Sequence, residues 1–531
     1  MAHRLSSPNR RGCAALVCIA FGLATIPTLL SGCGGSNGAA EKNTGAVAVV
    51  RAESDPLPNI IFIMIDTLRA DRLHSYGYSR QLTATMDKIA AEGVAFDRCI
   101  AVAPWTLPSI ASIITGYNPC VHKAASFRQI SAMDAGRTAV VPVLDDSFVT
   151  LAEELQQLGY QTAGFCANKF IKPEYGMAQG FDVFDTGFAA NTVQGKHINE
   201  AALKWITESR DASRPMFLYL HYMDVHGPYD AAPRFLDPLL AEVEANPNKQ
   251  PMPEELFQRI NLYLRKPPAN ASDPQRWNRL SRFRDYWVAR YDAGVWEMDY
   301  YLSQLVGKLE ELGVWDDALV VLTSDHGEAL GEHGLWDHGY SQFQTDIHVP
   351  LVLRWKNHLP AGQRVKATAS QLGLGPTLLE LLGVQPSMEV QGLSLLGHIR
   401  GDGDIETTAV VSADKISGKQ FAVVRDNYKL MLIPRPPQKQ PDGSLSPPQV
   451  SSWLFDLDAD PIEAFDLAST YPEKVRELAD VVKAHIYECR VVKPELKPQT
   501  RTIGEQEIQK LEALGYTGQA DGGDKPPEQS P

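Results

Sequence analysis

Cysteine is scarce in this sequence, and acidic side chains outnumber basic ones. The 531 residues include 7 cysteines, and none has the C-x-x-C spacing of a zinc knuckle or a thioredoxin-type site. There are 50 Lys and Arg against 64 Asp and Glu, so the formal net charge is −14. A surface of that charge repels nucleic acid, and we expect no nucleic-acid partner. The chain also has no internal repeat.

The bulk composition is that of a globular protein. Apolar residues make up 44% of the chain and charged residues 21%, which argues against disorder over most of its length. The length leaves room for about three domains of roughly 150 residues each. We therefore expect a large hydrophobic core.

The first 32 residues have a basic start and then an apolar run, and L-S-G-C follows at residues 30–33. This pattern resembles the lipobox of bacterial lipoproteins. The resemblance implies a signal peptide at 1–32, lipidation of Cys33 and a membrane anchor outside the cytoplasm, in the periplasm or at the cell surface. A plain signal peptide or a membrane-spanning helix are the alternatives, but the run contains Pro27 and is short for a span. Residues 33–56 are predicted to be a flexible tether.

Four cysteines remain beyond the predicted lipidation site: Cys99, Cys120, Cys166 and Cys489. An oxidising compartment permits a disulfide such as Cys99 to Cys120. Buried free thiols fit the sequence equally well, so both alternatives stay open.

Apolar runs alternate with helical patterns along the chain. The runs at 59–66, 215–226 and 318–328 suit strands that are buried on both faces. Amphipathic helical spacing occurs at 85–93, 150–159 and 295–313. This alternation predicts an α/β fold with a central, mostly parallel sheet flanked by helices.

Changes in the pattern of apolar runs and turns predict the domain boundaries. A catalytic domain is expected at 57–385, with a helical insertion at about 230–290. From 386 to 516, short apolar runs alternate with turns, which predicts a smaller antiparallel subdomain. The polar tail 517–531 is rich in Pro and Gly and is predicted to be disordered.

Three of the predicted strands end in side chains that bind metals. These side chains are Asp66, His221, Asp224, His226, Asp325 and His326. Ligands of open α/β sheets bind at the carboxyl ends of the strands, whereas a single Asp at such a place is usually a cap or a turn residue. Three such strand ends together favour a metal site for manganese, zinc, magnesium or calcium.

Five motifs in order resemble the sulfatase-like branch of the alkaline phosphatase superfamily, over about residues 57–515. The matching stretches include P-N-I-I-F-I-M-I-D-T-L-R-A-D, A-P-W-T-L-P-S-I-A-S-I-I-T-G, F-L-Y-L-H-Y-M-D-V-H-G-P-Y and T-S-D-H-G-E. The resemblance implies the α/β fold of this superfamily and the hydrolysis of an ester. It also implies a divalent metal (manganese, calcium or zinc), with one site and a possible second. It places the nucleophile on Thr106 and the metal ligands on Asp66, Thr106, Asp325 and His326.

Thr106 has a simpler interpretation as a helix N-cap, since Thr caps helices well and Pro108 is tolerated in a first turn. The two roles are compatible. A hydroxyl at a helix N-terminus lies beside free N–H groups and the positive end of the dipole, which favour an oxyanion and a bound phosphate or sulfate. With the motif order, we favour the nucleophile.

The nucleophile motif departs from the family pattern C/S-x-P-x-R, whose Cys or Ser is oxidised to formylglycine. Here the corresponding residues are Thr106, Pro108 and Ile110, and Thr67 replaces the second Asp of many sulfatases. Oxidation of Thr would give a ketone rather than an aldehyde, so the formylglycine route is closed. A Thr nucleophile resembles instead the phosphoryl-transferring relatives, in which the metal acts as Lewis acid.

Further histidines and an aspartate flank these motifs. His226 matches a family histidine near the substrate, where it could protonate the leaving oxygen. Asp224 and His338 are predicted to bind substrate or a second metal, with a loop role as the alternative. His221 lies within the strand and is predicted to be a packed core histidine.

Three hypotheses follow. The first is a metal-dependent phosphoester hydrolase or phosphoryl transferase with a Thr nucleophile; the second is a sulfuric ester hydrolase without formylglycine; the third is an inactive binding lipoprotein. The expected partners are a small-molecule, glycan or lipid-linked phosphate or sulfate ester, and a membrane reached through the lipid anchor.

Overall fold

The structure is a computed structural model. It describes residues 50–125, 128–133, 136–188, 194–245, 283–402, 408–412, 419–435, 437, 440, 444–447 and 449–512. The predicted signal peptide 1–32, the lipidation site Cys33, most of the tether, the central part of the insertion and the tail 517–531 lie outside the described residues. Within the described part, no helix is long and apolar enough to cross a membrane.

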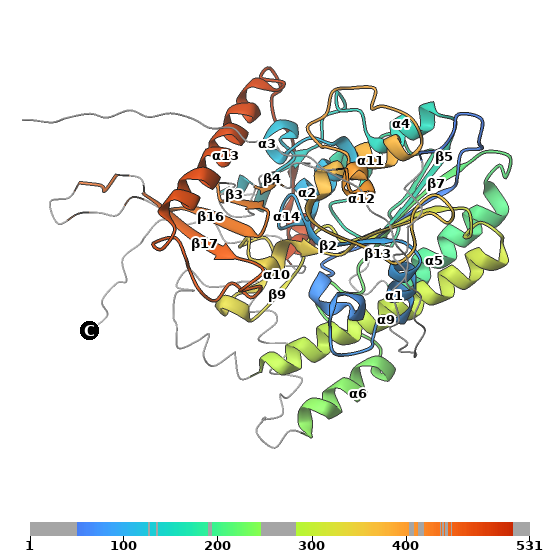
Figure 1. Cartoon of the computed structure of the whole chain (residues 1–531), viewed down its shortest axis with the longest axis horizontal. Coiled ribbons are helices and arrows are strands. Elements are labelled where there is room, and N and C mark those ends of the chain that lie inside the picture. Colours follow the sequence, from blue (N-terminus) through green and yellow to red (C-terminus); the bar gives the residue numbers. More distant parts are fainter. Residues whose placement is uncertain are drawn as a thin grey trace, which may run out of the picture. The chain divides into compact units, whose positions relative to one another are not determined.

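A mixed sheet of nine strands forms the centre of the fold (Figure 1). Its order is β11-β2-β12-β8-β1-β7-β5-β6, and β13 pairs with β2. The strands are β1 (Ile60–Ile65), β2 (Val94–Ile100), β5 (Gln161–Cys166), β6 (Val183–Asp185), β7 (Met216–Tyr222), β8 (Leu319–Thr323), β11 (His348–Val349), β12 (Leu351–Arg354) and β13 (Gln363–Ser370). The central run β8-β1-β7-β5-β6 is parallel throughout, whereas β12 pairs antiparallel with β8 and β2. The predicted mostly parallel sheet is confirmed.

Strand β1 shows why this sequence forms a sheet covered on both faces. Ile60, Phe62 and Met64 belong to one hydrophobic cluster, and Ile61 and Ile63 belong to another. Side chains alternate across a strand, so an unbroken apolar run buries both of its faces. Each such side chain contributes about 1.5 to 3 kcal/mol of burial free energy.

Helices cover both faces of the sheet. Apolar residues of α2 (Thr106–Thr115) and α11 (Leu374–Leu381) join the first cluster, and those of α1 (Ala84–Ala91), α5 (Gly195–Lys204) and α9 (Arg284–Glu311) join the second. The other helices are α3 (Pro119–His122), α4 (Leu151–Gln157), α6 (Pro233–Glu244), α10 (Gln344–Ile347), α12 (Leu396–Arg400), α13 (Pro472–Val491) and α14 (Glu505–Glu512). The described ends of the insertion, α6 and the start of α9, are helical.

The C-terminal part contains an antiparallel sheet in the order β14-β15-β16-β17. These strands are β14 (Thr408–Val411), β15 (Phe421–Arg425), β16 (Tyr428–Arg435) and β17 (Gln449–Asp456). Helix α13 packs on this sheet through Leu478 and Val482 (Figure 1). The smaller antiparallel sheet predicted from the alternating short runs is confirmed.

Two small sheets complete the described strands. β9 (Ala329–Leu330) pairs with β10 (Trp336–Asp337). β18 (Gln499–Ile503) pairs with β4 (Gly136–Val143), which also pairs with β3 (Arg128–Met133). The C-terminal segment thus returns to pair with a strand of the N-terminal half.

The cysteines resolve the alternatives left open by the sequence. Cys120 forms a disulfide with Cys489, 369 residues away. Cys99 and Cys166 are buried free thiols. A Cys99–Cys120 pairing is therefore wrong, because Cys99 lies in β2 within the hydrophobic core while Cys120 on α3 faces α13.

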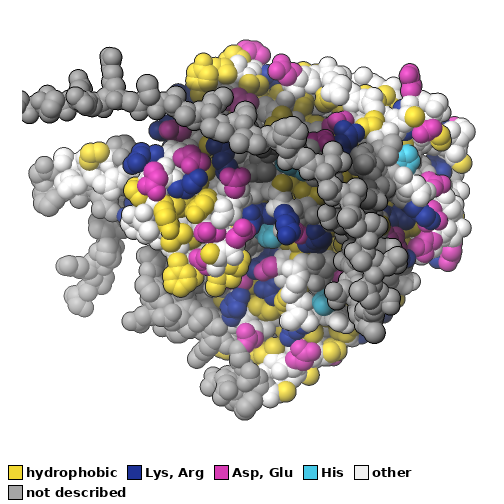
Figure 2. Space-filling view, in the orientation of Figure 1, with side chains coloured by type: hydrophobic (Ala, Val, Ile, Leu, Met, Phe, Trp, Pro, Cys, Tyr) yellow, Lys and Arg dark blue, Asp and Glu magenta, His cyan; other side chains and the backbone are white. Residues whose placement is uncertain are grey.

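Charges of both signs are interspersed on the face shown in Figure 2. Apolar side chains gather on the left of that view, in the region of β16 and β17 (Figures 1 and 2). On this face the acidic excess of the chain is not concentrated in a single field.

Candidate active site

Four adjacent parallel strands bring polar residues to one edge of the sheet. Asp66 directly follows β1, Asp325 lies two residues after β8, and Asn168 lies two residues after β5. His221 is the penultimate residue of β7 and is paired in register with Met64 of β1. Parallel strands end at the same edge, so these four side chains meet there.

Thr106 joins this group from the opposite direction, as the first residue of α2. Trp105 occupies the N-cap position, and no side chain caps the helix. The Thr106 hydroxyl lies 3.2 Å from His326 Nε2, and Asn168 Nδ2 donates to it at 3.3 Å. The Thr106 side chain is fully buried. Its hydroxyl therefore faces the strand ends, and the N-cap position belongs to its neighbour.

Asp66 stands at the centre of the group. Its Oδ2 accepts a hydrogen bond from Asn168 Nδ2 at 2.6 Å and lies 3.0 Å from His221 Nε2. Its Oδ1 has no hydrogen-bond partner within the described part of the chain, and His326 Nε2 is 3.7 Å away. Burial by itself raises the pKa of Asp66, but the hydrogen bond with His221 and the charges of His226 and His326 hold it well below its usual range. Asp66 is an ionised carboxylate with a free oxygen.

Asp325 is a second buried carboxylate beside it. Its Oδ1 accepts hydrogen bonds from the backbone N–H of His326 at 3.0 Å and of Thr67 at 3.4 Å. Burial, followed by the negative charge of Asp66, raises the pKa of Asp325. Two carboxylates held this close disfavour double ionisation unless a cation lies between them.

The donor set fits a divalent cation. The candidate ligand atoms of Asp66, His221 and Asp325 all lie within 4.8 Å of one another, and all three side chains are buried. Carboxylate oxygens with imidazole nitrogens suit manganese, zinc, magnesium or calcium. The free Oδ1 of Asp66 and the mutual repulsion of the two carboxylates are features that such an ion would satisfy.

The turn after Asp66 is strained. Thr67 has φ of 58°, in the left-handed region that β-branched residues avoid. Tyr291 of α9 donates a hydrogen bond of 2.7 Å to the Thr67 carbonyl, and its hydroxyl accepts from the Arg69 N–H at 3.0 Å. Strain of this kind persists where the surroundings fix the backbone, and it clusters at functional sites.

The glycine after His326 is required by a close approach of the backbone. A Cβ at Gly327 would overlap the carbonyl oxygen of Thr345, and Gly327 and Glu328 both donate backbone hydrogen bonds to the 345–346 segment at 2.8 Å. This packing fixes the loop that carries Asp325 and His326. The sequence D-H-G at this strand end therefore reflects a steric requirement.

A row of three histidines leads away from Thr106. The His326 ring lies 4.5 Å from that of His338, which lies 5.1 Å from that of His226, between centroids. His338 Nδ1 is 3.3 Å from Glu328 Oε1 and 3.0 Å from Asp337 Oδ1. The structure thus brings His226 and His338 beside the central group. Glu328, Asp337 and His338 form a second cluster of metal-type ligands.

Asp224 has a different environment. It accepts a hydrogen bond of 2.8 Å from the backbone N–H of Gly195, at the start of α5. Burial, followed by the negative charge of Glu297, raises the pKa of Asp224 to about 7. The structure ties Asp224 to a helix terminus, and its substrate-binding role stays a prediction.

Two members of the group were missed from the sequence. His221 was predicted to be a packed core histidine, and it is buried as predicted, but its Nε2 also lies 3.0 Å from Asp66 Oδ2 and its Nδ1 lies 3.0 Å from Tyr219 Oη. Asn168 was not predicted at all. Its signal was available, since it follows the apolar run T-A-G-F-C-A just as Asp325 follows β8.

A cavity lies away from this group. Its volume is about 580 Å³, and its lining includes Asn118, Gln391, Arg425, His485 and Glu488 but none of the strand-end residues described above. The side chains of the central group are buried.

Comparisons with known proteins show the family of the chain. The profile of the sulfatase family matches residues 58–384, more than half of the chain. The chain belongs to the sulfatase family. A second profile, N-sulphoglucosamine sulphohydrolase, C-terminal, matches residues 331–491. As a member of the sulfatase family the protein is a metal-dependent ester hydrolase.

Individual relatives of this sulfatase-family protein are distant. An N-acetylglucosamine-6-O-sulfatase from Bacteroides thetaiotaomicron is 22% identical over 517 residues, covering 81% of this chain and 86% of that protein. A solved structure in complex with its substrate D-glucosamine-2-N,6-O-disulfate superposes with a TM-score of 0.61 at 22% identity, covering 83% of this chain and 99% of the other. The phosphonate monoester hydrolase of Agrobacterium radiobacter gives 0.60 at 20% identity, covering 82% and 96%. These superpositions show the fold.

Proposed function

We propose that this protein cleaves a phosphate ester, or transfers its phosphoryl group, by attack of the Thr106 hydroxyl. The observation that carries the proposal is the convergence of Thr106 with Asp66, Asp325 and His326 in one buried group. A cap residue alone has no need of two carboxylates and an imidazole at its hydroxyl. Mono- and diesters of phosphate are the favoured substrate class.

Asp66, Asp325, His326 and the Thr106 hydroxyl are the proposed metal ligands, and His221 is a further candidate. A divalent ion held there would act as a Lewis acid and favour the alkoxide of the nucleophile. The resemblance implies manganese, zinc or calcium as the ion, and the carboxylate and imidazole donors suit these metals.

The remaining residues position the Thr106 hydroxyl and supply a proton to the leaving oxygen. Asn168 Nδ2 links Asp66 to Thr106, so it fixes the hydroxyl against the carboxylate. His226 and His338 lie beyond His326, where a leaving oxygen could receive a proton. Glu328 and Asp337 orient the His338 ring through Nδ1.

The choice of phosphate over sulfate rests on the fate of the intermediate. A phosphothreonine is resolved by water or by an acceptor alcohol, which regenerates Thr106. A sulfated threonine lacks the aldehyde-forming exit that formylglycine provides, and Ile110 replaces the arginine of the formylglycine motif.

A sulfuric ester is the second candidate, and the relatives favour it. The Bacteroides thetaiotaomicron relative acts on a sulfated sugar by its name. A sulfated glycan or small-molecule sulfate is the corresponding substrate class for this chain. The fold also occurs in a phosphonate monoester hydrolase, whose named substrate is a phosphorus ester.

Paired aryl substrates test the proposal. Bis(p-nitrophenyl) phosphate, p-nitrophenyl phosphate and p-nitrophenyl sulfate are assayed with the wild type and with Thr106→Ala, each with added manganese, zinc or calcium. We expect turnover of a phosphate ester that Thr106→Ala abolishes. Turnover of the sulfate ester alone would favour the second candidate, a sulfuric ester hydrolase. A Thr106→Ala variant as active as the wild type would show that Thr106 is not the nucleophile.

A further inference from the structure

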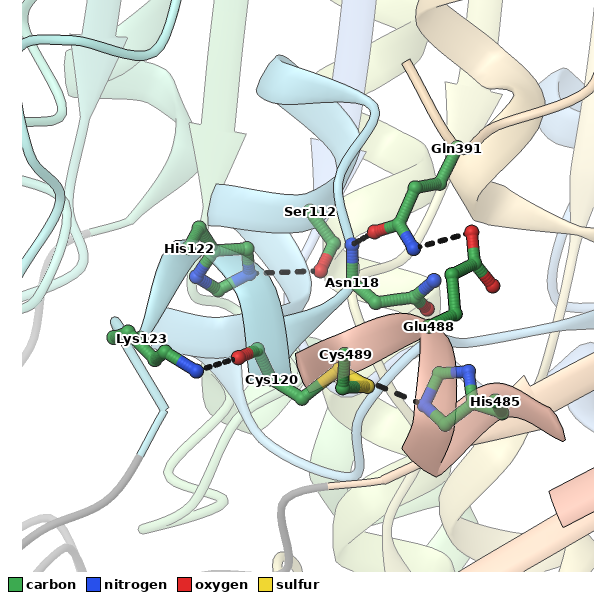
Figure 3. Close-up of a disulfide and its surroundings, with 9 residues drawn as sticks. All are labelled: Ser112, Asn118, Cys120, His122, Lys123, Gln391, His485, Glu488 and Cys489. Atoms are coloured by element: carbon green, nitrogen blue, oxygen red, sulfur yellow. Dashed lines mark hydrogen bonds between the residues drawn. A yellow bond between two sulfur atoms is a disulfide. The ribbon is translucent and has the colours of Figure 1, made fainter. Parts of the chain in front are cut away.

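The disulfide joins two helices that are far apart in the sequence. Cys120 lies in α3, just after the nucleophile helix α2 ends at Thr115, and Cys489 lies near the end of α13. Their Cα atoms are 5.5 Å apart. The link therefore fastens α13 to the helix that follows α2 (Figure 3).

An imidazole stands against this sulfur pair. His485 precedes Cys489 by one helical turn, and its Nε2 lies 3.7 Å from Cys120 Sγ (Figure 3). His485 is buried, and burial lowers its pKa. An imidazole nitrogen is a common metal ligand.

One ligand pair already has the spacing of a tetrahedral site, whereas the two bonded sulfurs must separate on reduction. Zinc binds sulfur at about 2.3 Å and histidine nitrogen at about 2.0 to 2.1 Å, which places two tetrahedral ligands of these kinds about 3.6 Å apart. The observed N–S distance of 3.7 Å matches this value. Ligand atoms of Cys120, His485 and Cys489 all lie within 4.8 Å of one another.

The surroundings offer an entry path. His485 and Glu488 line the 580 Å³ cavity. Gln391 donates a hydrogen bond of 2.7 Å to Glu488 Oε1 and accepts one of 2.9 Å from the Asn118 N–H (Figure 3). This network holds the Glu488 carboxylate against Gln391, and the fourth position is left to a water molecule.

We propose that Cys120, His485 and Cys489 form a zinc site when the disulfide is reduced. A dithiol reductant exchanges with the disulfide, so that its two thiols become a disulfide and Cys120 and Cys489 each become a thiol. Zinc then binds the two thiolates and the neutral imidazole, and two protons are released. The site shares no residue with the strand-end group, so it does not depend on the proposed function.

The consequence concerns the attachment of α13. In the oxidised protein a covalent bond holds this helix to α3. In the reduced protein the metal replaces that bond with coordination by the same residues. The cross-link is thus retained in both redox states as long as zinc is present.

Cobalt is the probe for this site, because thiolate-bound Co²⁺ has a charge-transfer absorption in the near ultraviolet. The exported chain is compared in its oxidised form and after reduction with a phosphine, with the excess reductant removed. We expect the thiolate band only in the reduced protein, with loss of the band on addition of zinc. Ligands at the strand-end group are oxygen and nitrogen, so metal bound there does not produce it.

Three variants make the test decisive. Cys489→Ser should abolish the band, and His485→Gln, which keeps the disulfide and so folds as the wild type does, should weaken cobalt affinity at least tenfold in the reduced state. Cys166→Ser removes a buried thiol in β5 and should change nothing. A reduced wild type without the band, or a band that survives in Cys489→Ser or binds equally tightly in His485→Gln, overturns the proposal.

Discussion

Asn168 donates a hydrogen bond of 2.6 Å to Asp66 Oδ2, and the same amide nitrogen lies 3.3 Å from the Thr106 hydroxyl. The Asn168 side chain, just after β5, therefore fixes the position of the Asp66 carboxylate relative to the Thr106 hydroxyl. Asp66 follows β1 and Thr106 begins α2, so no local sequence feature fixes their separation. The Asn168 amide fixes this separation, because it contacts both side chains at the edge of the sheet.

Replacing Asn168 tests this positioning role. Asn168→Ala removes both contacts, and we expect activity or metal affinity to fall by about 10- to 100-fold, as for other residues that orient metal ligands. Steady-state kinetics with metal titration measure it. Asn168→Asp has the same shape but places a further negative charge beside Asp66, and we expect it to be no better than the Ala variant. Wild-type kinetics in the Ala variant would show that the amide only fills space.

Thr106 is tested by paired substitutions. Thr106→Ala should lower turnover by on the order of 10³-fold or more, since covalent catalysis loses its first step. Thr106→Ser keeps the hydroxyl and should retain activity on phosphate esters, without gaining sulfatase activity, because position 110 is still Ile. Mass spectrometry after rapid quench should find a phosphate-sized adduct on Thr106. An unmodified Thr106 in an active enzyme would contradict the mechanism.

Metal removal should affect both activity and stability. Asp66 and Asp325 are buried carboxylates whose charges repel, so the metal-free protein should unfold at a lower temperature than the loaded one. An ion at 100 times its dissociation constant stabilises the fold by about 2.7 kcal/mol. Calorimetry with and without chelator measures this shift, and Asp325→Asn should diminish it. Full activity after complete removal of metal would exclude the site.

Asp224 predicts a pH dependence of stability in the metal-free protein. Its pKa is raised from the ordinary 3.8 to about 7 in the folded chain, by burial first. The folded state therefore binds more protons than the unfolded state between these values. The contribution of the protonated Asp224 carboxyl to the free energy of unfolding is fully present below about pH 4. It is lost as the pH rises to about 7, with a slope of about 1.4 kcal/mol per pH unit.

Denaturant unfolding at several pH values checks this slope. Asp224→Asn keeps an oxygen that accepts the Gly195 hydrogen bond but does not ionise, so it should stabilise the protein more at pH 8 than at pH 4.5. Asp237→Asn, at an exposed position in α6, is the control. Equal effects of Asp224→Asn at both pH values would mean that the carboxyl ionises as freely as it does in water.

The lipobox resemblance predicts that Cys33, which lies outside the described residues, anchors the chain to a membrane. If the lipobox interpretation holds, Cys33→Ala should be exported without a lipid and recovered in the soluble fraction. Fractionation followed by mass spectrometry of the N-terminus measures this. Membrane retention of the variant would favour a different anchor.

Part of this protein could be predicted from local sequence alone. The apolar run before Asp66 predicted β1, because a strand buried on both faces needs apolar residues at every position. The helical spacing at 150–159 predicted α4, and the structure begins this helix with a capping box between Thr150 and Glu153. Residues at strand ends were the natural candidates for the site, since parallel strands deliver their ends to one edge.

Other features depended on contacts between distant segments. His221 has the pattern of a core residue, and only the pairing of β7 beside β1 brings its ring to Asp66. Asn168 carries no charge, and its importance appears only when β5 lies next to β7. Cys120 gave no indication of its partner, because 369 residues separate it from Cys489 and periodicity extends only along a single element.

The sequence by itself determined the alternation of strands and helices, the position of Thr106 at a helix start and the acidic and imidazole side chains at strand ends, because burial and turn chemistry act over a few residues. The tertiary structure decided which of these side chains meet. Hydrogen bonds and charge interactions weaken steeply with distance, so a buried group such as Asp66, Asp325 and His221 exists only after packing has brought three strands together. The same packing buries Cys99 in the core and places Cys120 against α13.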